Sequence, residues 1–438
     1  MRATCLAGCL AMWAAMPVIN AVAQEAAQAP SGPAFDVRDF GAICDGKSDD
    51  TAAIQKALNA AAAKGGVVNL PAGNLLLKGH IAIPSGVALK GRWTAPHHAM
   101  VAANTTLLAT EGEGKEDGEP FIMMEQSSSL SGVTIHYPGQ NIDAVKAYPW
   151  TIRGRMMHVT IQDVTLTNSY KGIDFGTHHG ELHTIRNVFG SCLKMGVYVN
   201  NCTDIGRIEN VHFNPHYWAR SGAANAPRGD QWEKYLQYVR ENLVAFTFGR
   251  SDWEFVFNTF CYGAKIGYHF VRTPEGECNG NFLGIASDGG PVCVQADGVA
   301  PYGVLITNGE FVAMNHPDAV AIVTGDKFDG ALQLANCAFW GPAKKIAELR
   351  GKGHVSFRQC NVCDWGGKDG KSPAFHILGG DAHVTGCRFT RDRLHFLIEP
   401  GADGVIISEN FFREKMIIQG DKVKGALIVR DNLERKKD

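Results

Sequence analysis

The sequence predicts an all-β protein built as a parallel β-helix, a solenoid in which short strands stack coil upon coil. Three observations support this fold class. One short motif recurs along most of the chain, short apolar runs separate its copies, and a strand–turn–helix segment precedes them. A coil this short cannot bury its own apolar face, so it must stack on its neighbours. We therefore expect one extended domain with an N-terminal capping helix.

The recurring motif, here called the corner motif, places Asn, Asp or Gly directly after an apolar strand. Its copies include IQDV (161–164), IRNV (185–188), IENV (208–211) and FNTF (257–260), and they recur about every 23 to 28 residues, with one interval roughly doubled. An Asn side chain at a turn can hydrogen-bond the backbone and stack in ladders. We therefore assign Asn187, Asn210, Asn258 and Asn308 to structure rather than to catalysis.

The runs between the motifs distinguish a β solenoid from a helical one. Runs such as GVYV (196–199), AFTF (245–248) and GVLI (303–306) are rich in Val, Ile, Phe and Tyr and are bounded by Gly. Ten-residue stretches with helical periodicity and a leucine scaffold are both missing from these repeated runs. Several short strands per coil with Gly-rich corners indicate a parallel β-helix.

The chain divides into four segments. Residues 1–23 carry an early Arg, an apolar stretch and the sequence Ala21-Val22-Ala23, which is typical of a cleaved secretory signal. Residues 24–33 are expected to be a flexible lead-in, 34–100 the N-terminal cap and first coils, and 101–433 the β-helix. No other segment has 18 consecutive apolar residues, so a membrane span is not predicted. We expect a secreted or periplasmic protein.

Composition narrows the partners. The 438-residue chain is 45% hydrophobic with a net charge of −2, so it lacks the basic field that recruits nucleic acid. Ten cysteines follow the predicted signal. Three of them, Cys337, Cys360 and Cys387, fall inside corner motifs, where a small buried residue fits a stacked interior. We predict mostly buried free thiols and no zinc site at Cys360-Asn361-Val362-Cys363, a single CxxC without a second pair.

The segment 35–91 contains a short strand, a Cys-Asp-Gly turn, a helix from about Asp50 to Lys64 and further strands separated by Gly and Pro. We expect the helix to cover the unpaired edge of the first coil. Helix capping accounts for Asp49 and Asp50 better than chemistry does.

This segment resembles the N-terminal part of the pectate lyase superfamily, the polygalacturonase-like β-helix enzymes, and more loosely alginate epimerases and phage tailspike depolymerases. The resemblance covers about 60 residues and is carried by Asp39-Phe40-Gly41-Ala42, Asp45-Gly46, Asp49-Asp50-Thr51, Ala53-Ile54, Val68, Asn69, Pro71 and Gly73. It implies a right-handed parallel β-helix and carbohydrate chemistry.

The resemblance does not extend to the catalytic motifs of polygalacturonases. The series N-T-D, D-D, G-H-G and R-I-K has only partial echoes here, in Asn201-Cys202-Thr203-Asp204 and Arg207-Ile208-Glu209, and the D-P-H-E signature of alginate epimerases is absent. No family catalytic residue is therefore carried over to this chain.

The repeat itself supplies a register that locates candidates. Counting back from the corner motifs aligns the stretches 177–183, 200–207, 249–255, 272–278 and 324–330, and aligned residues of a parallel stack lie on one face about 4.8 Å apart. This face is rich in polar residues, namely His178, His179, Glu181, Asp204, Arg250, Asp252, Glu254, Arg272, Glu275 and Glu277. The concentration predicts a site on the central coils.

Within this face, Asp252 and Glu254 form an i, i+2 pair of the kind that glycoside hydrolysis needs, with Asp204, Glu181 and Glu277 on neighbouring coils. We predict Asp252, Glu254, Asp204 and Glu181 as catalytic. His178, His179, Arg250, Arg272 and Glu277 are predicted to bind substrate.

An insertion at about 214–242 is too long and too aromatic for an ordinary corner. Part of it, Gln231 to Glu241, can form a helix. Its Tyr217, Trp218 and Trp232 are predicted to stack on sugar rings, with packing against the solenoid wall as the alternative. His212, His216 and His316 fall on another side of the coil and are taken as structural or peripheral.

These features predict a secreted enzyme that cleaves a polysaccharide or oligosaccharide, with hydrolysis ahead of β-elimination. A lyase would use His178 or His179 as a base and Arg250 or Arg272 to neutralise a uronic acid carboxylate. No cofactor or metal is expected for hydrolysis, and Ca²⁺ is expected only for a lyase. A non-catalytic glycan-binding solenoid is the third alternative.

Overall fold

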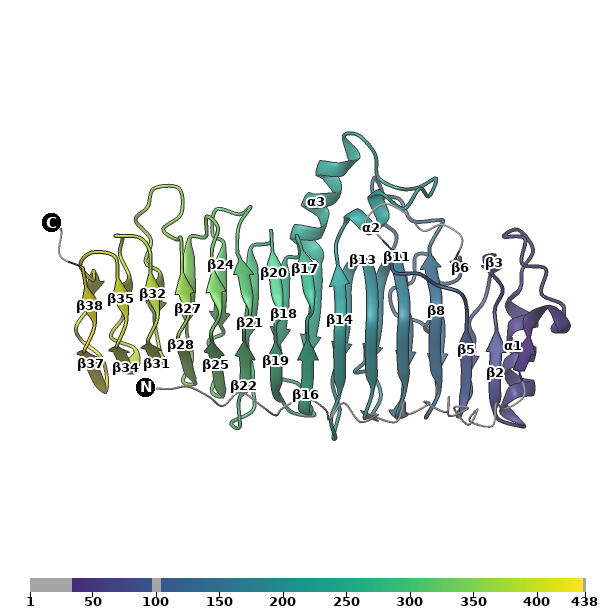
Figure 1. Cartoon of the computed structure of the whole chain (residues 1–438), viewed down its shortest axis with the longest axis horizontal. Helices are drawn as coiled ribbons and strands as arrows, with labels where there is room; N and C mark the ends of the chain where they lie inside the picture. The colour runs from purple at the N-terminus through teal and green to yellow at the C-terminus, as the bar shows by residue number, and fades with distance from the viewer. Residues whose placement is uncertain (1–33, 97–103, 436–438) are drawn as a thin grey trace, which may run out of the picture.

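The computed structural model describes residues 34–96 and 104–435. The predicted signal peptide and lead-in lie outside the described residues. Thirty-six strands form one continuous parallel sheet that winds along the long axis of the molecule (Figure 1). The predicted parallel β-helix is confirmed. No helix of the described part is long and apolar enough to cross a membrane.

Each central coil has three strands, and strands of the same kind pair from coil to coil. The first set, here called the groove sheet, runs through these strands in order of pairing: β1 (Ala34–Asp36), β2 (Gly66–Asn69), β5 (Val87–Lys90), β8 (Ser129–His136), β11 (Thr160–Phe175), β13 (Thr184–Val199), β14 (Arg207–Phe213), β16 (Ser251–Phe257), β19 (Cys278–Leu283), β22 (Val304–Thr307), β25 (Ala331–Ala335), β28 (His354–Arg358), β31 (Gly380–Thr385), β34 (Ala402–Ser408) and β37 (Ala426–Arg430).

The second sheet follows the corner motifs and includes β3 (Gly73–Leu77), β6 (Thr105–Ala109), β17 (Phe260–Tyr262), β20 (Ala286–Asp288), β23 (Glu310–Val312), β26 (Ala338–Phe339), β29 (Asn361–Val362), β32 (Arg388–Phe389), β35 (Phe411–Phe412) and β38 (Leu433–Glu434). The third includes β4 (Ile81–Ile83), β7 (Ile122–Met124), β9 (Trp150–Gly154), β15 (Val244–Phe248), β18 (Ile266–Phe270), β21 (Val292–Ala296), β24 (Val320–Thr324), β27 (Lys345–Leu349), β30 (Phe375–Ile377), β33 (Phe396–Ile398) and β36 (Ile418–Gln419). The long strands β8, β11, β13 and β14 bend from one sheet into the next, and β10 (Met156–Met157) pairs with β12 (Gly180–Glu181) beside them.

The corner motif is the bend between the groove sheet and the second sheet. Its residue adopts positive φ in successive coils, for example +53° at Asn187, +52° at Asn210 and +51° at Asn258. Asn and Gly tolerate this left-handed conformation better than other residues. The amide of Asn187 donates to Asp163 at 2.8 Å, and that of Asn210 donates to Asn187 at 2.9 Å. The predicted side-chain ladder is confirmed for Asn187 and Asn210.

The interior is filled by stacked apolar side chains from all three sheets. Phe246 stacks on Tyr268 of the next coil with 4.8 Å between ring centroids, and Phe248 stacks on Phe270 at 5.6 Å. All ten described cysteines are free, and Cys337, Cys360 and Cys387 are buried. The prediction of mostly buried thiols is confirmed. Each corner thiol donates to a carbonyl of the preceding coil, as Cys387 does to Phe357 at 3.5 Å.

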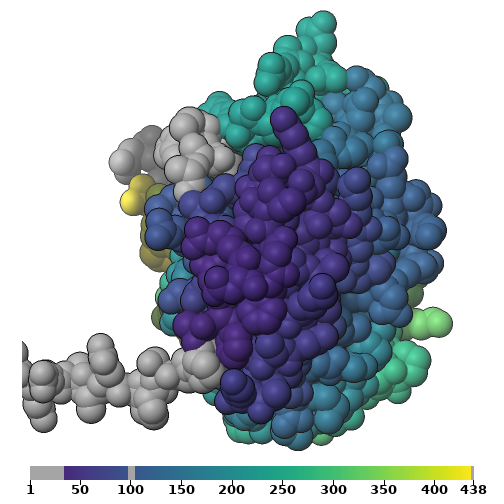
Figure 2. Space-filling view, turned by 90° about the vertical axis from the view of Figure 1, so that its right-hand side faces the viewer, coloured from purple at the N-terminus to yellow at the C-terminus, as the bar shows by residue number. Residues whose placement is uncertain are grey.

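Four helices occur among the described residues, two near the N-terminal end and two in the insertion. A short 3-10 helix, η1 (Val37–Phe40), precedes α1 (Thr51–Ala62), which lies at the N-terminal end and buries Ile54 and Leu58 beside β2 and β4. Its capping role stays a prediction. The insertion holds α2 (His216–Ala219) and α3 (Gln231–Asn242), as its sequence predicts for the latter. Figure 2 views the solenoid along its axis from the N-terminal end and shows this insertion rising above the coils.

Candidate functional site

Consecutive coils bring a row of polar side chains to the edge where the groove sheet begins. Gly180, Cys202, Ser251 and Cys278 pair with one another in parallel register across four coils. Cys202, Ser251 and Cys278 are fully buried, so the residues that flank them point outward. These outward residues, here called the outer ladder, are His179 and Glu181, Asn201 and Thr203, Arg250 and Asp252, and Glu277 and Asn279.

The first two coils of the outer ladder are joined by side-chain hydrogen bonds. His179 Nε2 lies 2.9 Å from Thr203 Oγ1, and the Thr203 hydroxyl donates to Glu181. His179 Nε2 is also 3.5 Å from Glu181 Oε1. A histidine, a hydroxyl and a carboxylate therefore share one patch, which can bind hydroxyl groups and exchange protons.

The next two coils hold the charged part of the outer ladder. Arg250 Nη2 contacts Asp252 Oδ2 at 2.9 Å, and this hydrogen bond raises the pKa of the Arg250 guanidinium. Arg272, at the following corner, bonds both Glu277 and Asp329, and its pKa is raised mainly by the bond with Glu277. Each arginine predicted to bind substrate therefore already holds a carboxylate.

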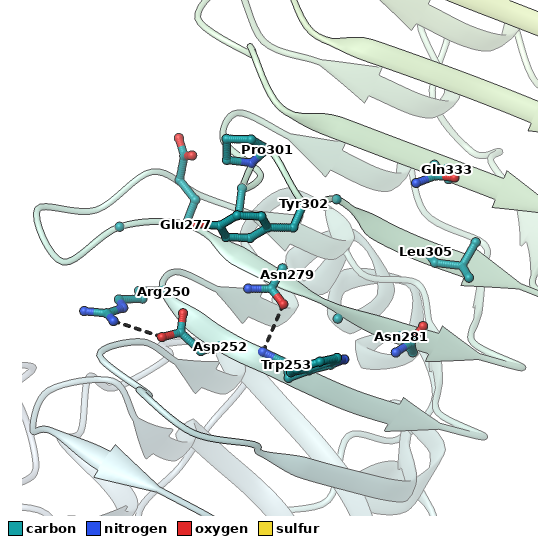
Figure 3. A pocket seen from close by; sticks show the side chains of 14 residues that line it. Arg250, Asp252, Trp253, Glu277, Asn279, Asn281, Pro301, Tyr302, Leu305 and Gln333 are labelled. Carbon is teal, nitrogen blue, oxygen red and sulfur yellow. Dashed lines mark hydrogen bonds and ion pairs between the residues drawn. The ribbon is translucent and has the colours of Figure 1, made fainter.

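A groove of about 830 Å³ opens beside this charged part (Figure 3). It crosses β16, β19, β22 and β25, so its length follows the solenoid axis. Its lining consists of Arg250, Asp252, Trp253, Gly276, Glu277, Asn279, Gly280, Asn281, Ala300, Pro301, Tyr302, Gly303, Leu305 and Gln333. The groove combines exposed aromatic rings, amides and one ion pair, which are the side chains that bind sugars.

Trp253 enters the groove through a β-bulge. Ser251 pairs with Cys278 and Glu254 with Gly280, so β16 has one residue more than β19 at this point. Trp253 occupies the extra position at φ +72° and is 60% exposed. Positive φ in a bulky residue costs about 1–3 kcal/mol, and such strain concentrates at functional sites. The bulge therefore displays an aromatic ring at an energetic cost.

The bulge also explains why the prediction for Glu254 fails. In regular alternation Asp252 and Glu254 would share the outer face, but the extra residue reverses the order after Trp253. The Glu254 side chain is fully buried, whereas that of Asp252 is 40% exposed. The predicted placement of Glu254 beside Asp252 on one face is wrong.

Inside the coil, Glu254 belongs to a separate polar cluster, here called the inner cluster. Its carboxylate accepts from the Ser251 hydroxyl and lies 3.1 Å from His183 Nε2, while His183 Nδ1 lies 3.8 Å from Cys202 Sγ. Burial opposes protonation of His183, but the charge and hydrogen bond of Glu254 and the contact with Cys202 outweigh it and raise the pKa to about 10. His183 and Glu254 therefore form a buried ion pair.

The inner cluster has donor types that also suit a metal. Ligand atoms of His183, Cys202 and Glu254 lie within 4.8 Å of one another, and nitrogen, sulfur and oxygen are the ligands that Zn²⁺ uses. However, the two ring nitrogens of His183 face different partners, and one metal ion can be bound by only one of them. This arrangement favours hydrogen bonding across the ring over chelation.

The remaining predicted residues divide between the outer ladder and other places. Asp204 is exposed one residue beyond Thr203, and its backbone carbonyl accepts from Leu182. His178 is half-buried beside His179.

Sequence reasoning missed Trp253, Tyr302, Asn279, Asn281 and Gln333. The register that located Asp252 also passes through Asn279, so counting outward residues coil by coil could have found it.

The aromatic residues of the insertion lie away from the groove. Trp218 is fully buried and Tyr217 is 5% exposed, and neither they nor Trp232 lines the groove. Trp232 packs on His216 with 4.5 Å between ring centroids. The insertion follows the C-terminal end of β14, whereas the outer ladder lies at the N-terminal end of the neighbouring parallel strand β16 (Figure 1). The prediction that Tyr217 and Trp218 stack on sugar is wrong, because both are buried against the solenoid wall.

Comparison with known proteins supports the fold and the superfamily. Residues 34–121 match the family described as rhamnogalacturonase A/epimerase, pectate lyase-like. The predicted resemblance to the pectate lyase superfamily is confirmed. The N-terminal fragment of bacteriophage phi29 gene product 12 has a similar structure, with a TM-score of 0.58 and 12% identity over 90% of this chain and 72% of that chain. The catalytic domain of GH87 α-1,3-glucanase in complex with nigerose has a TM-score of 0.52 and 12% identity, covering 82% and 67% of the two chains.

Sequence similarity to curated proteins is local. The mannuronan C5-epimerase AlgE3 of Azotobacter vinelandii is 63% identical over 46 residues, which are 10% of this chain and 2% of that protein. The plasmin and fibronectin-binding protein A of Streptococcus pneumoniae (strain ATCC BAA-255 / R6) is 29% identical over 158 residues, or 32% of this chain and 21% of that protein. The matched segments are thus small parts of these relatives.

Proposed function

We propose that this protein is an enzyme that cleaves a polysaccharide bound in the groove, and that the reaction is glycoside hydrolysis. The observation that carries the proposal is the outer ladder, which places Glu181 and Asp252 in register two coils apart, with Asp252 beside exposed Trp253 and Tyr302 in the groove. A similarity of the first coils to a pectate lyase-like family supports carbohydrate as the substrate class.

Two carboxylates of the outer ladder suit the proposed reaction. Glu181 and Asp252 occupy equivalent positions two coils apart, which corresponds to about 10 Å along the stack. Inverting hydrolysis uses two carboxyl groups roughly 6.5 to 9.5 Å apart, with water between one of them and the sugar. The spacing of two coils is close to the upper end of that range. We assign Asp252, ion-paired with Arg250, as the base and Glu181 as the acid.

The proposal is tested by product analysis on purified protein and a panel of plant, algal and bacterial glycans. Hydrolysis releases reducing ends without new ultraviolet absorbance. We expect Asp252→Asn and Glu181→Gln to lower kcat about 10²- to 10⁴-fold, since each removes a proton-transfer group. Glu310→Gln is the matched control, because Glu310 is exposed on the second sheet. Full activity in both ladder variants would refute the assignment.

β-Elimination is the second candidate, because Arg250 lines the groove and His179 lies on the same ladder. In this reaction His179 would remove a proton beside a uronic acid carboxylate that Arg250 neutralises. An unsaturated product with ultraviolet absorbance identifies it. Loss of activity with a chelator, restored by Ca²⁺, would add a metal that hydrolysis does not need.

We also propose that the protein is exported, because residues 1–23 have the pattern of a cleaved signal. The expected mature N-terminus is Gln24, directly after Ala21-Val22-Ala23. Intact-mass measurement of protein recovered from the periplasm or medium tests this position. Recovery of the uncleaved chain from the cytoplasm would refute export.

A further inference from the structure

The charges of the groove are compensated within the protein. Among the described residues that line it, only Arg250, Asp252 and Glu277 are charged. Arg250 is held by Asp252, and Glu277 is held by Arg272, which also bonds Asp329. Two guanidinium groups thus meet three carboxylates. An anionic sugar would find no unpaired cation here and would face a net negative charge.

The uncharged polar groups of the groove, in contrast, are open to a ligand. The side-chain amides of Asn281 and Gln333 have no hydrogen-bond partner among the described residues. They point outward from β19 and β25, and Leu305 of β22 lies in register between them. The two amides are therefore two coils, or about 10 Å, apart along the axis. Each can donate to and accept from sugar hydroxyls.

Two aromatic rings flank the near end of this row. Trp253 is 60% and Tyr302 is 82% exposed, and they lie on opposite sides of Asn279 (Figure 3). Asn279 Oδ1 accepts from the Trp253 amide at 3.1 Å, so its NH₂ group remains for the groove. Gly280 and Gly303 also line the groove at this point. A sugar ring over Asn279 would contact apolar faces and an amide donor together.

We propose that the groove takes an uncharged polysaccharide, whose units carry hydroxyl groups but no carboxylate or sulfate, lying along the solenoid axis over Asn279, Asn281 and Gln333. This inference rests on the proposed function and narrows it, because a sugar without a carboxylate is cleaved by hydrolysis and not by β-elimination of a uronate. The ion pairs then serve to shape the groove and to hold Asp252.

The test is calorimetric titration of the purified protein with two sets of hexasaccharides. One set contains glucose, galactose, mannose or xylose in several linkages, and the other contains galacturonate or mannuronate. We expect binding of a neutral hexasaccharide with a Kd that changes less than about twofold between low and high salt, because no charge is neutralised. Asn281→Ala and Gln333→Ala should each raise this Kd about three- to tenfold. Gln419→Ala, an exposed position on β36, is the matched control and should leave it unchanged.

The outcomes separate the substrate class from the proposed activity. Binding of a uronate hexasaccharide that weakens with salt and is lost in Arg250→Gln would overturn the inference, while cleavage of that sugar would leave the enzyme proposal standing. Binding of a neutral hexasaccharide without release of reducing ends would support the inference and refute the hydrolase. Binding of neither set would refute both.

Discussion

The two faces of one short segment of β16 place their carboxylates in different surroundings. Asp252 and Glu254 are separated by one residue in β16, yet Asp252 lies in the groove and Glu254 lies in the core. The outer carboxylate is partly exposed and paired with Arg250, whereas the inner one is fully buried and contacts His183 and Ser251. The bulge at Trp253 separates the two roles. A polar residue of this solenoid therefore faces the groove or the core according to the local strand pairing, and one extra residue is enough to reverse the alternation.

The largest expected effect follows from breaking the inner pair. Removal of one partner of a buried ion pair usually costs about 3–5 kcal/mol, because the other charge is left buried and unpaired. We expect His183→Leu to lower the free energy of unfolding by about that amount. Arg250→Gln, which breaks the outer pair, should cost less than about 1 kcal/mol because both groups are solvated. Urea unfolding followed by tryptophan fluorescence measures both.

The double variant His183→Leu/Glu254→Leu is the control for this prediction. It removes both charges, so part of the stability lost in His183→Leu should return. The contrast between the two faces is contradicted if His183→Leu is no more damaging than Arg250→Gln. It is also contradicted if the two substitutions are additive, that is, if the double variant loses as much stability as His183→Leu and Glu254→Leu lose together when each is measured alone.

The second prediction concerns pH. The pKa of His183 rises from 6.5 to about 10 in the folded protein, so the folded state holds this proton more tightly than the unfolded state does. The resulting stabilisation is complete below about pH 6.5, declines as pH rises, and is gone above about pH 10. The stability difference between wild type and the double Leu variant should therefore shrink across this window. A difference that stays constant from pH 6.5 to 10 would show that His183 is neutral in the fold.

Sequence reasoning succeeded where the repeat controls the structure. The corner motif fixes the period, and its Asn residues report a backbone conformation that few other residues tolerate, so Asn187 and Asn258 could be placed without coordinates. The same period aligned Glu181, Arg250 and Asp252 on one edge. These assignments depend only on counting from the corners, which the stacking of coils makes dependable.

The rest depended on local departures from the repeat. One extra residue in β16 inverts the alternation, so Glu254 turned inward and Trp253 turned outward, against the period-two expectation. The insertion begins at the far end of β14, and no pattern in its sequence indicates which side of the coil it covers. The sequence therefore predicted that Trp218 stacks on a sugar ring, although this side chain is buried.

The third prediction separates function from stability at the bulge. Trp253→Gly removes the exposed ring and also relieves the positive φ, which glycine adopts without strain. We expect the thermal midpoint to stay the same or rise, while the Kd for the bound glycan rises about tenfold. Trp340→Gly is the control, since Trp340 is 44% exposed outside the groove. Loss of stability without loss of affinity would assign Trp253 to the fold instead.

The smallest effect is expected at the Asn residues of the corner motif, because the motif is repeated in many coils and each copy contributes little to the free energy of unfolding. Asn187 holds φ +53°, donates to Asp163 and accepts from Asn210. Asn187→Ala should lower the free energy of unfolding by about 1–2 kcal/mol, because alanine is strained in this conformation. Asn187→Gly keeps the conformation and loses only the side-chain hydrogen bonds, so it should cost less than the alanine variant. Both variants should retain full glycan cleavage, because the corner and the outer ladder lie at opposite ends of the groove-sheet strands. Equal costs for the two variants would mean that the side-chain hydrogen bonds, and not the backbone conformation, select Asn at the corner.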